Sequence, residues 1–504
     1  MTTSSNIKKS ALISYLGLVI SIVAGLLYTP WMVKQIGQSD YGLYALVSTF
    51  LTYFIMDFGL GQAIARYIAK YRANKQEEKV NQLLGITAKL YLWISFFLFV
   101  ILILVYIYIE NIFQELSTIE VEKFKVIFLI AGLFSLISFP FSPLNGILIA
   151  YESFVFLKIC DILNKLGAII LMVIALLLGY KLYAIVAINA MMALIIIVLK
   201  LIYIYKKTEI NINLKYKDKV LIKELFSFSI WMTIIGIAQR LLINLAPTLL
   251  GIYSGTTAIA IFSIGMLVES YVWTFANALN GLFLPRVTEL TKESSNREVV
   301  LNLMIKVGRL QLFVIGILYV GFFTLGKEFI LLWMGVDFEE SYLIAICLIL
   351  PGFVTLTQEI ASTLLYVENE VKYKAILFIS CCIFSLLLSF FLIPSCGALG
   401  ASFSIGFSIV LFHLFGMNLV YYKVMNLNVV LFFKETFLKL GPAIFLSLVF
   451  GFFINYYYPA DNFIFFFMKT VMIVLIYLIL MWFVGLNKYE KELFKSILFK
   501  ILPK

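Results

Sequence analysis

The sequence predicts an all-α protein that crosses a membrane many times, and three observations support this. Of its 504 residues, 62% are hydrophobic and 13% are charged, whereas soluble domains are about 45–50% apolar and about 25% charged. The apolar residues form long runs, and about fourteen of these runs reach the length of roughly 20 residues that a spanning helix needs. The runs show no sustained alternation of apolar and polar residues, so membrane strands are not expected.

The expected spans follow one another along the whole chain with short loops between them. No stretch has the composition of a soluble domain, and the first apolar run is too long for the core of a cleaved signal peptide. The predicted spans are 11–33, 41–67, 84–109, 126–149, 156–179, 182–205, 226–252, 256–284, 307–327, 341–366, 372–394, 397–422, 439–457 and 463–485.

Lysine and arginine are unevenly divided between the two sets of loops. The loops on the side of the N-terminus hold most of them, and the opposite loops hold few. The positive-inside rule therefore predicts that both termini are cytoplasmic. The net charge of +11 is therefore located in loops that orient the protein in the membrane, so it does not indicate a nucleic-acid partner. The basic loops on the predicted inner side lie within 70–79, 206–223, 286–306, 372–374, 423–434 and 488–495.

The chain carries a weak internal repeat. Pro30 is followed by the polar turn 37–40 and a new apolar run, and Pro247 is followed by the turn 254–257 and a new run at an offset of 217 residues. A second pair of hinges, 151–155 and 367–371, aligns at an offset one residue shorter. Six helices per copy would make the copies parallel, related by an axis along the membrane normal.

The repeat predicts two six-helix lobes around a central cavity, with about two extra helices at the C-terminus. The last segment places apolar residues one helical turn apart among lysines, which is typical of a helix lying on the inner membrane surface. The predicted divisions are an N-lobe at 1–205, a basic cytoplasmic linker at 206–225, a C-lobe at 226–422, extra helices at 423–485 and an amphipathic cytoplasmic tail at 486–504.

Two stretches near the N-terminus resemble a known family. The stretch 28–44, YTPWMVKQIGQSDYGLY, is similar to the first outer turn of the polysaccharide (O-antigen-type) flippases of the multidrug/oligosaccharidyl-lipid/polysaccharide exporter superfamily. The stretch 57–67, DFGLGQAIARY, resembles the second helix of that family. The resemblance implies a two-lobed transporter of twelve to fourteen helices.

The resemblance also implies the substrate. Members of the family move undecaprenyl-pyrophosphate-linked oligosaccharides, the repeat units of O-antigen, capsule or exopolysaccharide, from the inner to the outer leaflet of the bacterial cytoplasmic membrane. The expected partners are then the lipid-linked glycan, the membrane lipids, and the polymerase or glycosyltransferases that handle the same glycan. Such a protein is a transporter that works by alternating access, and no catalytic residue and no cofactor are expected.

Arg240 is the strongest candidate for substrate binding. It lies deep in the seventh predicted span, beside Gln239 and four residues before Asn244. A charge at that depth is costly unless it faces a cavity or a partner, and a guanidinium matches a pair of phosphate oxygens. We expect Arg240, with Gln239 and Asn244, to meet the anionic head of the substrate. The alternative is an internal ion pair, for instance with Glu269.

Two acidic residues lie in spans that are equivalent in the two halves. Asp57 and Glu269 lie near the middle of the second and eighth spans, where they would carry coupling protons or balance basic groups. Arg66, at the inner end of the second span, would bind a pyrophosphate or act as a positive-inside anchor.

Polar residues inside the spans have two interpretations. Asn145 is placed to bind sugar hydroxyls or to connect helices, and the second role is commoner. Asp161 and Lys165 lie four residues apart on one predicted helix, where opposite charges face each other, so we expect them to pair.

Other classes of function have less support. The five cysteines form no C-x-x-C pair, so no metal site is predicted. The stretch 321–327 imitates a phosphate-binding loop, but Glu328 follows where Ser or Thr should hold magnesium. An ion-coupled multidrug exporter of the same fold is the first rival, although the first span contains no acidic residue. A membrane polysaccharide polymerase or glycosyltransferase is the second, although no outer loop is long enough for a catalytic domain.

Overall fold

A computed structural model of the chain describes residues 2–54, 60–208, 218–277 and 297–501, together with the single residues 210, 212, 216, 287 and 289. Every regular element in these ranges is helical. The described residues divide into two compact units. The first contains residues 1–263 and 382–401, and the second contains residues 264–381 and 402–504.

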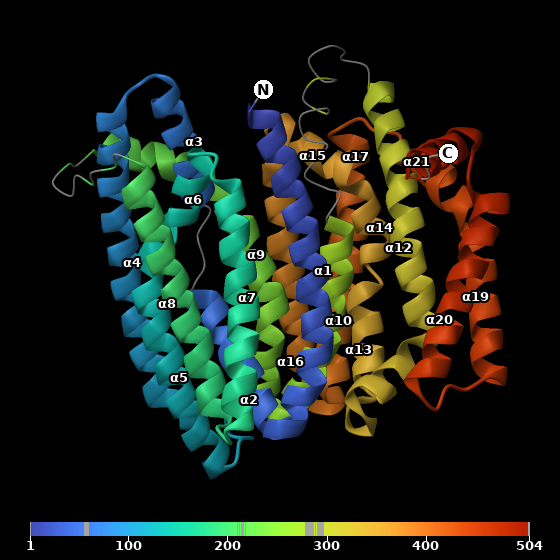
Figure 1. Cartoon of the computed structure of the whole chain (residues 1–504), viewed down its shortest axis with the longest axis horizontal. Helices are drawn as coiled ribbons and strands as arrows, with labels where there is room; N and C mark the ends of the chain where they lie inside the picture. The colour runs from blue at the N-terminus through green and yellow to red at the C-terminus, as the bar shows by residue number, and fades with distance from the viewer. Residues whose placement is uncertain are drawn as a thin grey trace. The chain divides into compact units, whose positions relative to one another are not determined.

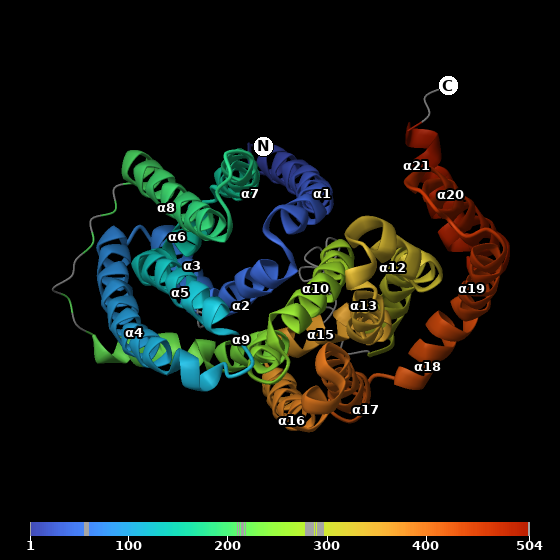
Figure 2. The same ribbon diagram turned by 90° about the horizontal axis from the view of Figure 1, so that it is seen from below.

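The first unit is built from the N-terminal helices (Figure 1). Within it α1 packs on α7, α3 on α6, α5 on α8, and α2 on both α5 and α9; Figure 2 shows the first of these pairs end-on. Its elements are α1 (Thr2–Ile36), α2 (Gln38–Phe54), α3 (Leu60–Ala73), α4 (Glu77–Ile112), α5 (Thr118–Ser138), η1 (Phe139–Phe141), α6 (Pro143–Ala150), α7 (Phe154–Leu177), α8 (Leu182–Lys207), α9 (Lys219–Tyr253), the start of α10 (Gly255–Asn277) and the middle of α16 (Val371–Ile409).

The second unit is organised around the long helix α12. This helix packs against α19, α20, α15 and η4, and a core of aliphatic and aromatic side chains that includes Leu312, Ile315 and Tyr477 joins α12 to α20. Its further elements are α12 (Arg297–Met334), η3 (Val336–Phe338), α13 (Ser341–Ile349), α14 (Gly352–Thr355), η4 (Leu356–Gln358), α15 (Glu359–Val367), η5 (Val410–Gly416), α17 (Met417–Lys423), α18 (Val429–Phe433), η6 (Lys434–Leu438), α19 (Lys439–Tyr457), α20 (Phe463–Leu480), η7 (Met481–Gly485) and α21 (Lys488–Ile501).

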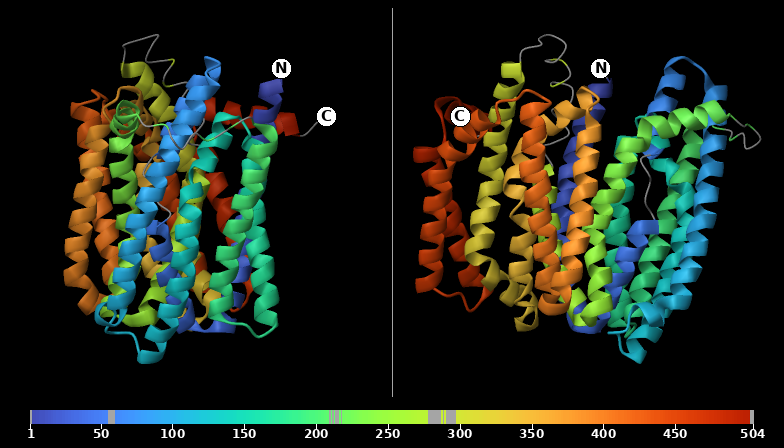
Figure 3. Two further views of the ribbon diagram at one scale, coloured as in Figure 1. Left: turned by 90° about the vertical axis from the view of Figure 1, so that its left-hand side faces the viewer. Right: turned by 180° about the vertical axis from the view of Figure 1, so that it is seen from behind.

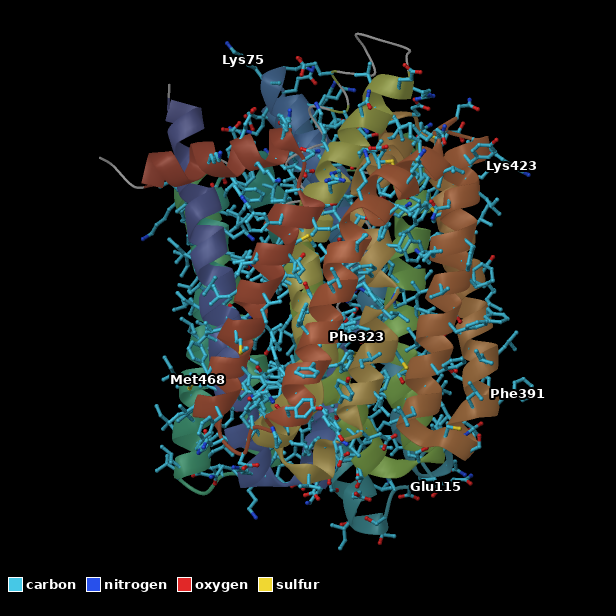
Figure 4. The ribbon with its side chains drawn as sticks, turned by 90° about the vertical axis from the view of Figure 1, so that its right-hand side faces the viewer. Lys75, Glu115, Phe323, Phe391, Lys423 and Met468 are labelled. Atoms are coloured by element: carbon cyan, nitrogen blue, oxygen red, sulfur yellow. The ribbon has the colours of Figure 1, made fainter. Side chains whose placement is uncertain are left out.

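Charged and apolar residues are separated along the helix axes in each unit. In the first unit Lys75 and Glu115 lie at opposite ends (Figure 4). In the second, Lys423 lies at one end and Phe323 lies near the middle (Figure 4). The middle parts of the outer helices expose large apolar side chains, for example Trp93 on α4 and Met472 on α20. A bilayer covers such surfaces and water does not, so the chain is a multi-pass integral membrane protein.

The described residues contain eleven helices that are long and apolar enough to cross a membrane, or twelve if the bent pair 336–349 and 352–367 is one span. Two differences separate this number from the predicted fourteen. The second predicted span includes residues 55–59, which lie outside the described residues. The predicted spans 372–394 and 397–422 run together as 371–423, although Gly397 has a non-helical φ of 52° within this stretch. The number fourteen therefore stays a prediction.

The linker between the predicted lobes is partly helical. The described part of 206–225 includes the start of α9, at Lys219. Figure 3 shows the first turns of α9 running across the end of the unit before the helix turns along its neighbours. The portion of α9 that is apolar enough to span a membrane begins at Thr233.

The hinges repeat at a single offset. Glu152 and Asn369 both have a left-handed φ, of 54° and 59°. In each case one further residue separates the left-handed residue from the start of a long helix, α7 or α16. The backbone hydrogen bond from Ser153 to Leu148 recurs from Glu370 to Leu365. These hinges are therefore 217 residues apart, and the helices that follow the first pair of hinges, which begin at Gln38 and Gly255, have the same offset. The predicted shorter offset is wrong, because residue letters do not reveal which position adopts the left-handed conformation.

Candidate functional site

Arg240 lies on α9 next to the end of α2. Its Nη1 donates a hydrogen bond of 3.1 Å to the carbonyl oxygen of Thr52, in the last turn of α2. Helix C-termini carry unpaired carbonyl groups and partial negative charge, so a cation is favoured there. Asn244, one turn farther along α9, donates to the carbonyl oxygen of Arg240, and Gln239 is exposed. Of the three predicted residues, Arg240 and Asn244 are thus in contact.

The guanidinium of Arg240 has one described hydrogen-bond acceptor. It is half-buried and lies inside a candidate span. A guanidinium carries five N–H donors, and within the described residues of its unit only the carbonyl oxygen of Thr52 accepts from it. A cation in a membrane span is costly unless it meets partners or faces a cavity, so the surroundings of this guanidinium bear directly on its role.

Arg309, on α12 in the second unit, is a useful contrast. Its side chain is buried, with 4% of its surface exposed. It forms a bidentate ion pair with Glu490 of α21, with 2.8 Å between Nη2 and Oε2, and it donates to the carbonyl oxygens of Glu435 and Gly485. These contacts use four of the five N–H donors of this arginine and neutralise its charge, which indicates a structural role.

Asn145 contacts a cation that the sequence analysis missed. Lys200 of α8 is buried, and its Nζ donates a hydrogen bond of 2.8 Å to Oδ1 of Asn145 on α6. A lysine within a predicted span was the available signal, but its nearness to the inner end of the helix made it resemble an ordinary flanking residue. The contact supports the helix-connecting interpretation of Asn145.

The basic residues of α3 have different surroundings. Arg66 is exposed, near the middle of α3. Arg72 donates a hydrogen bond of 2.7 Å to the carbonyl oxygen of Ala150, and its guanidinium lies 3.7 Å from the centre of the Tyr151 ring. Arg72 therefore fixes the hinge between α6 and α7.

The predicted coupling residues remain untested. Asp57 lies outside the described residues. Glu269 is half-buried on α10, and no described residue of the second unit forms an ion pair with it. The predicted contact between Asp161 and Lys165 is replaced by one between Asp161 and Lys158, at 3.5 Å. Both spacings bring side chains together on a helix, so spacing alone cannot choose between them.

Two ion pairs that hold the C-terminal helices were also missed. Besides the pair of Arg309 and Glu490, Lys469 of α20 pairs with Glu328 of α12 at 2.6 Å and also donates to Asn455 of α19. The tail that was predicted to be a surface anchor is indeed helical, as α21, and the ion pair with Arg309 attaches it to the second unit. Within the described residues, no group of His, Cys, Asp and Glu could hold a metal ion.

Comparison with known families decides the classification. The profile of the family described as polysaccharide biosynthesis protein matches residues 7–291, which is more than half of the chain. The chain belongs to this family. Members of the family are transporters and not enzymes, which removes the polymerase and glycosyltransferase alternatives. Comparison with curated proteins gives no significant sequence match.

Solved structures show the fold of this family member. A structure titled as the lipid II flippase MurJ in an inward closed conformation is 16% identical, with a TM-score of 0.70, and the match covers 98% of this chain and 100% of that one. An inward-facing multidrug resistance MATE transporter of the MOP superfamily is 16% identical, with a TM-score of 0.61, and the match covers 81% of this chain and 98% of that one. An outward-facing multidrug resistance MATE structure is 16% identical, with a TM-score of 0.54, and the match covers 82% of this chain and 94% of that one. The chain therefore has the fold of MOP-superfamily transporters, as the resemblance implied.

Proposed function

We propose that this transporter moves a polyprenyl-pyrophosphate-linked oligosaccharide from the inner to the outer leaflet by alternating access. The observation that carries the proposal is the half-buried guanidinium of Arg240, which lies inside a candidate span and, among the described residues of its unit, donates only to the carbonyl oxygen of Thr52. A pyrophosphate presents several anionic oxygens to these donors. Membership of the polysaccharide biosynthesis family supports a glycan as the rest of the substrate.

The other predicted residues take supporting roles in this proposal. Arg66 is exposed on α3 and would meet the pyrophosphate as it enters, and Gln239 is exposed beside Arg240. Asn145 acts through Lys200, whose ammonium it holds. Asp57 and Glu269 would balance these cations or couple transport to an ion gradient. The host membrane would be the bacterial cytoplasmic membrane, with both termini inside and the glycan's polymerase or glycosyltransferases as protein partners.

The proposal is tested with purified protein in liposomes that contain a fluorescent polyprenyl-pyrophosphate oligosaccharide. Flipping is measured as the fraction of glycan that a membrane-impermeant glycosidase removes over time. We expect Arg240→Ala to slow flipping at least tenfold. Arg240→Lys should keep part of the wild-type rate, since lysine keeps the positive charge but cannot bind two oxygens in the bidentate manner of a guanidinium. Lys327→Ala removes an exposed cation that pairs with Glu339 and should leave the rate unchanged.

Two results would reject the proposal. If folded and correctly inserted wild-type protein leaves the glycan in its original leaflet, the lipid-linked glycan is not the substrate. Transport of an organic cation dye in the same liposomes, unaffected by Arg240→Ala, would favour the multidrug exporter instead, because a cationic substrate gains nothing from a guanidinium.

A further inference from the structure

Three side chains from the beginnings of three helices meet in the first unit. Ser39 is in the first turn of α2, Glu120 in the first turn of α5 and Thr256 in the first turn of α10. Oε1 of Glu120 accepts hydrogen bonds from Oγ of Ser39 at 2.5 Å and from Oγ1 of Thr256 at 2.6 Å. The two hydroxyl oxygens are 3.2 Å apart. We call these three residues the outer latch.

The carboxylate of Glu120 is held in place from its other side. Oε2 accepts from the backbone N–H of Ser117 at 2.9 Å and from Oγ of Ser117 at 2.8 Å, which forms a capping box at the start of α5. Since both oxygens are engaged, the carboxylate cannot rotate away from the hydroxyls without breaking the cap. The latch is therefore a preorganised acceptor for two donors.

The backbones around the latch are close. A Cβ atom on Gly42 of α2 would lie 2.1 Å from the carbonyl oxygen of Thr256, so only glycine allows this approach. A second link is an ion pair between Lys123 of α5 and Asp40 of α2, at 2.6 Å. The starts of α2 and α10 are thus held together directly and through Glu120, while the ion pair adds a second contact between α5 and α2.

Ser39 and Thr256 occupy corresponding positions of the internal repeat, 217 residues apart. The contact therefore joins the same turn of the two copies, at the end that the charge distribution predicts to be outside. Ser39 and Glu120 are partly exposed, so water can replace their hydroxyl–carboxylate contact when the helices separate. Such contacts suit a junction that opens and closes, whereas a packed apolar contact would resist opening.

We propose that the outer latch holds the outer turns of the two repeats together, and that it must open before substrate is released on the outer side. The inference rests on the proposed function, because it assumes a carrier that alternates between inward and outward access. It adds the residues that close the outer side, none of which lies among the substrate-binding candidates.

The first test locks the latch with a disulfide. In Ser39→Cys/Thr256→Cys, the side chains replace hydroxyls 3.2 Å apart, so the sulfur atoms should reach each other on oxidation. We expect oxidation to abolish flipping of the fluorescent lipid-linked glycan and reduction to restore it. Each single cysteine variant should flip under both conditions. Cysteines that fail to crosslink, or a crosslinked protein that flips at the reduced rate, would overturn the proposal.

The second test loosens the latch and needs no substrate. Ala260→Cys places a thiol at a fully buried position of α10, one turn after Thr256. A membrane-impermeant maleimide, added to intact cells, should label this thiol several-fold faster when Glu120→Ala is also present. Glu110→Ala is the matched control, because Glu110 is an exposed carboxylate of the same outer region that pairs with Lys125 and has no described contact with the latch. The protein with its native cysteines alone gives the background.

The outcomes separate the two proposals. Equal labelling with Glu120→Ala and Glu110→Ala would reject the latch, whatever the substrate is. If Glu120→Ala speeds labelling but the protein flips no lipid-linked glycan, the proposed role of the latch stands and the proposed substrate is rejected. If Glu120→Ala does not fold, the disulfide test decides alone, since it leaves Glu120 in place.

Discussion

Ser39 and Thr256 face each other across 3.2 Å, although 217 residues of sequence separate them. The position of Gly42, one turn after Ser39, makes this approach possible, because its missing side chain leaves room for the carbonyl group of Thr256. A single methyl group at this position should therefore disturb the start of both helices.

The first prediction follows directly. Gly42→Ala places a Cβ 2.1 Å from the carbonyl oxygen of Thr256, and overpacking of this kind costs about 1–3 kcal/mol. We expect a lower midpoint of thermal unfolding in detergent, followed by tryptophan fluorescence. Gly236→Ala is the control, because no atom lies within 4 Å of its added Cβ, and alanine in a helix is about 0.5–1 kcal/mol better than glycine. Equal midpoints for the two variants would contradict the close approach.

The second prediction concerns the buried pair of Arg309 and Glu490. Glu490→Ala leaves the guanidinium buried without its counterion, which typically costs about 3–5 kcal/mol. We expect a large loss of thermal stability and faster proteolysis of α21. The double variant Arg309→Met/Glu490→Met should recover much of the loss, since no buried charge remains.

Lys327 and Glu339 provide the comparison for this pair. Their side chains are 55% and 46% exposed, and surface ion pairs contribute about 0–1 kcal/mol. Lys327→Ala should therefore change the unfolding midpoint little. A comparable effect of both single substitutions would show that burial does not distinguish the two pairs.

The third prediction separates two roles of Asn145. If Asn145 chiefly holds Lys200, Asn145→Leu should destabilise the protein, because it leaves a buried ammonium without its acceptor. Combining it with Lys200→Met should recover stability, with a coupling energy of about 1 kcal/mol or more in a double-mutant cycle. A loss of glycan flipping at unchanged stability would instead assign Asn145 to the substrate.

The fourth prediction uses the two left-handed hinge residues. Glu152 has a φ of 54° and Asn369 a φ of 59°, and this conformation costs most residues about 1–2 kcal/mol but is easier for asparagine and glycine. Glu152→Gly should raise the unfolding midpoint slightly, because the relief of strain exceeds the extra entropy of the unfolded chain. Asn369→Gly should give a smaller change. A larger gain at Asn369 would contradict the assigned conformations.

The sequence by itself determined the class of the protein and most of its helices. The thickness of the hydrocarbon core sets the length of each apolar run, so runs such as 84–109 and 182–205 predicted helices that the structure contains as α4 and α8. Pro30 and Pro247, each followed by a short polar turn, revealed the first pair of repeated hinges. The depth of Arg240 in its span also identified it as an unusual charge before any contact was known.

Only the tertiary structure decided which polar groups are partners. Arg309 and Glu490 are 181 residues apart, Lys469 and Glu328 are 141 apart, and the latch joins three separate helices. The local pattern of apolar and polar residues reports which face of a helix is buried, but it contains no information on which distant helix meets that face. The order of charged residues along the chain therefore does not reveal their partners, whereas the packing of the helices determines which charges are neutralised, as Arg309 is by Glu490.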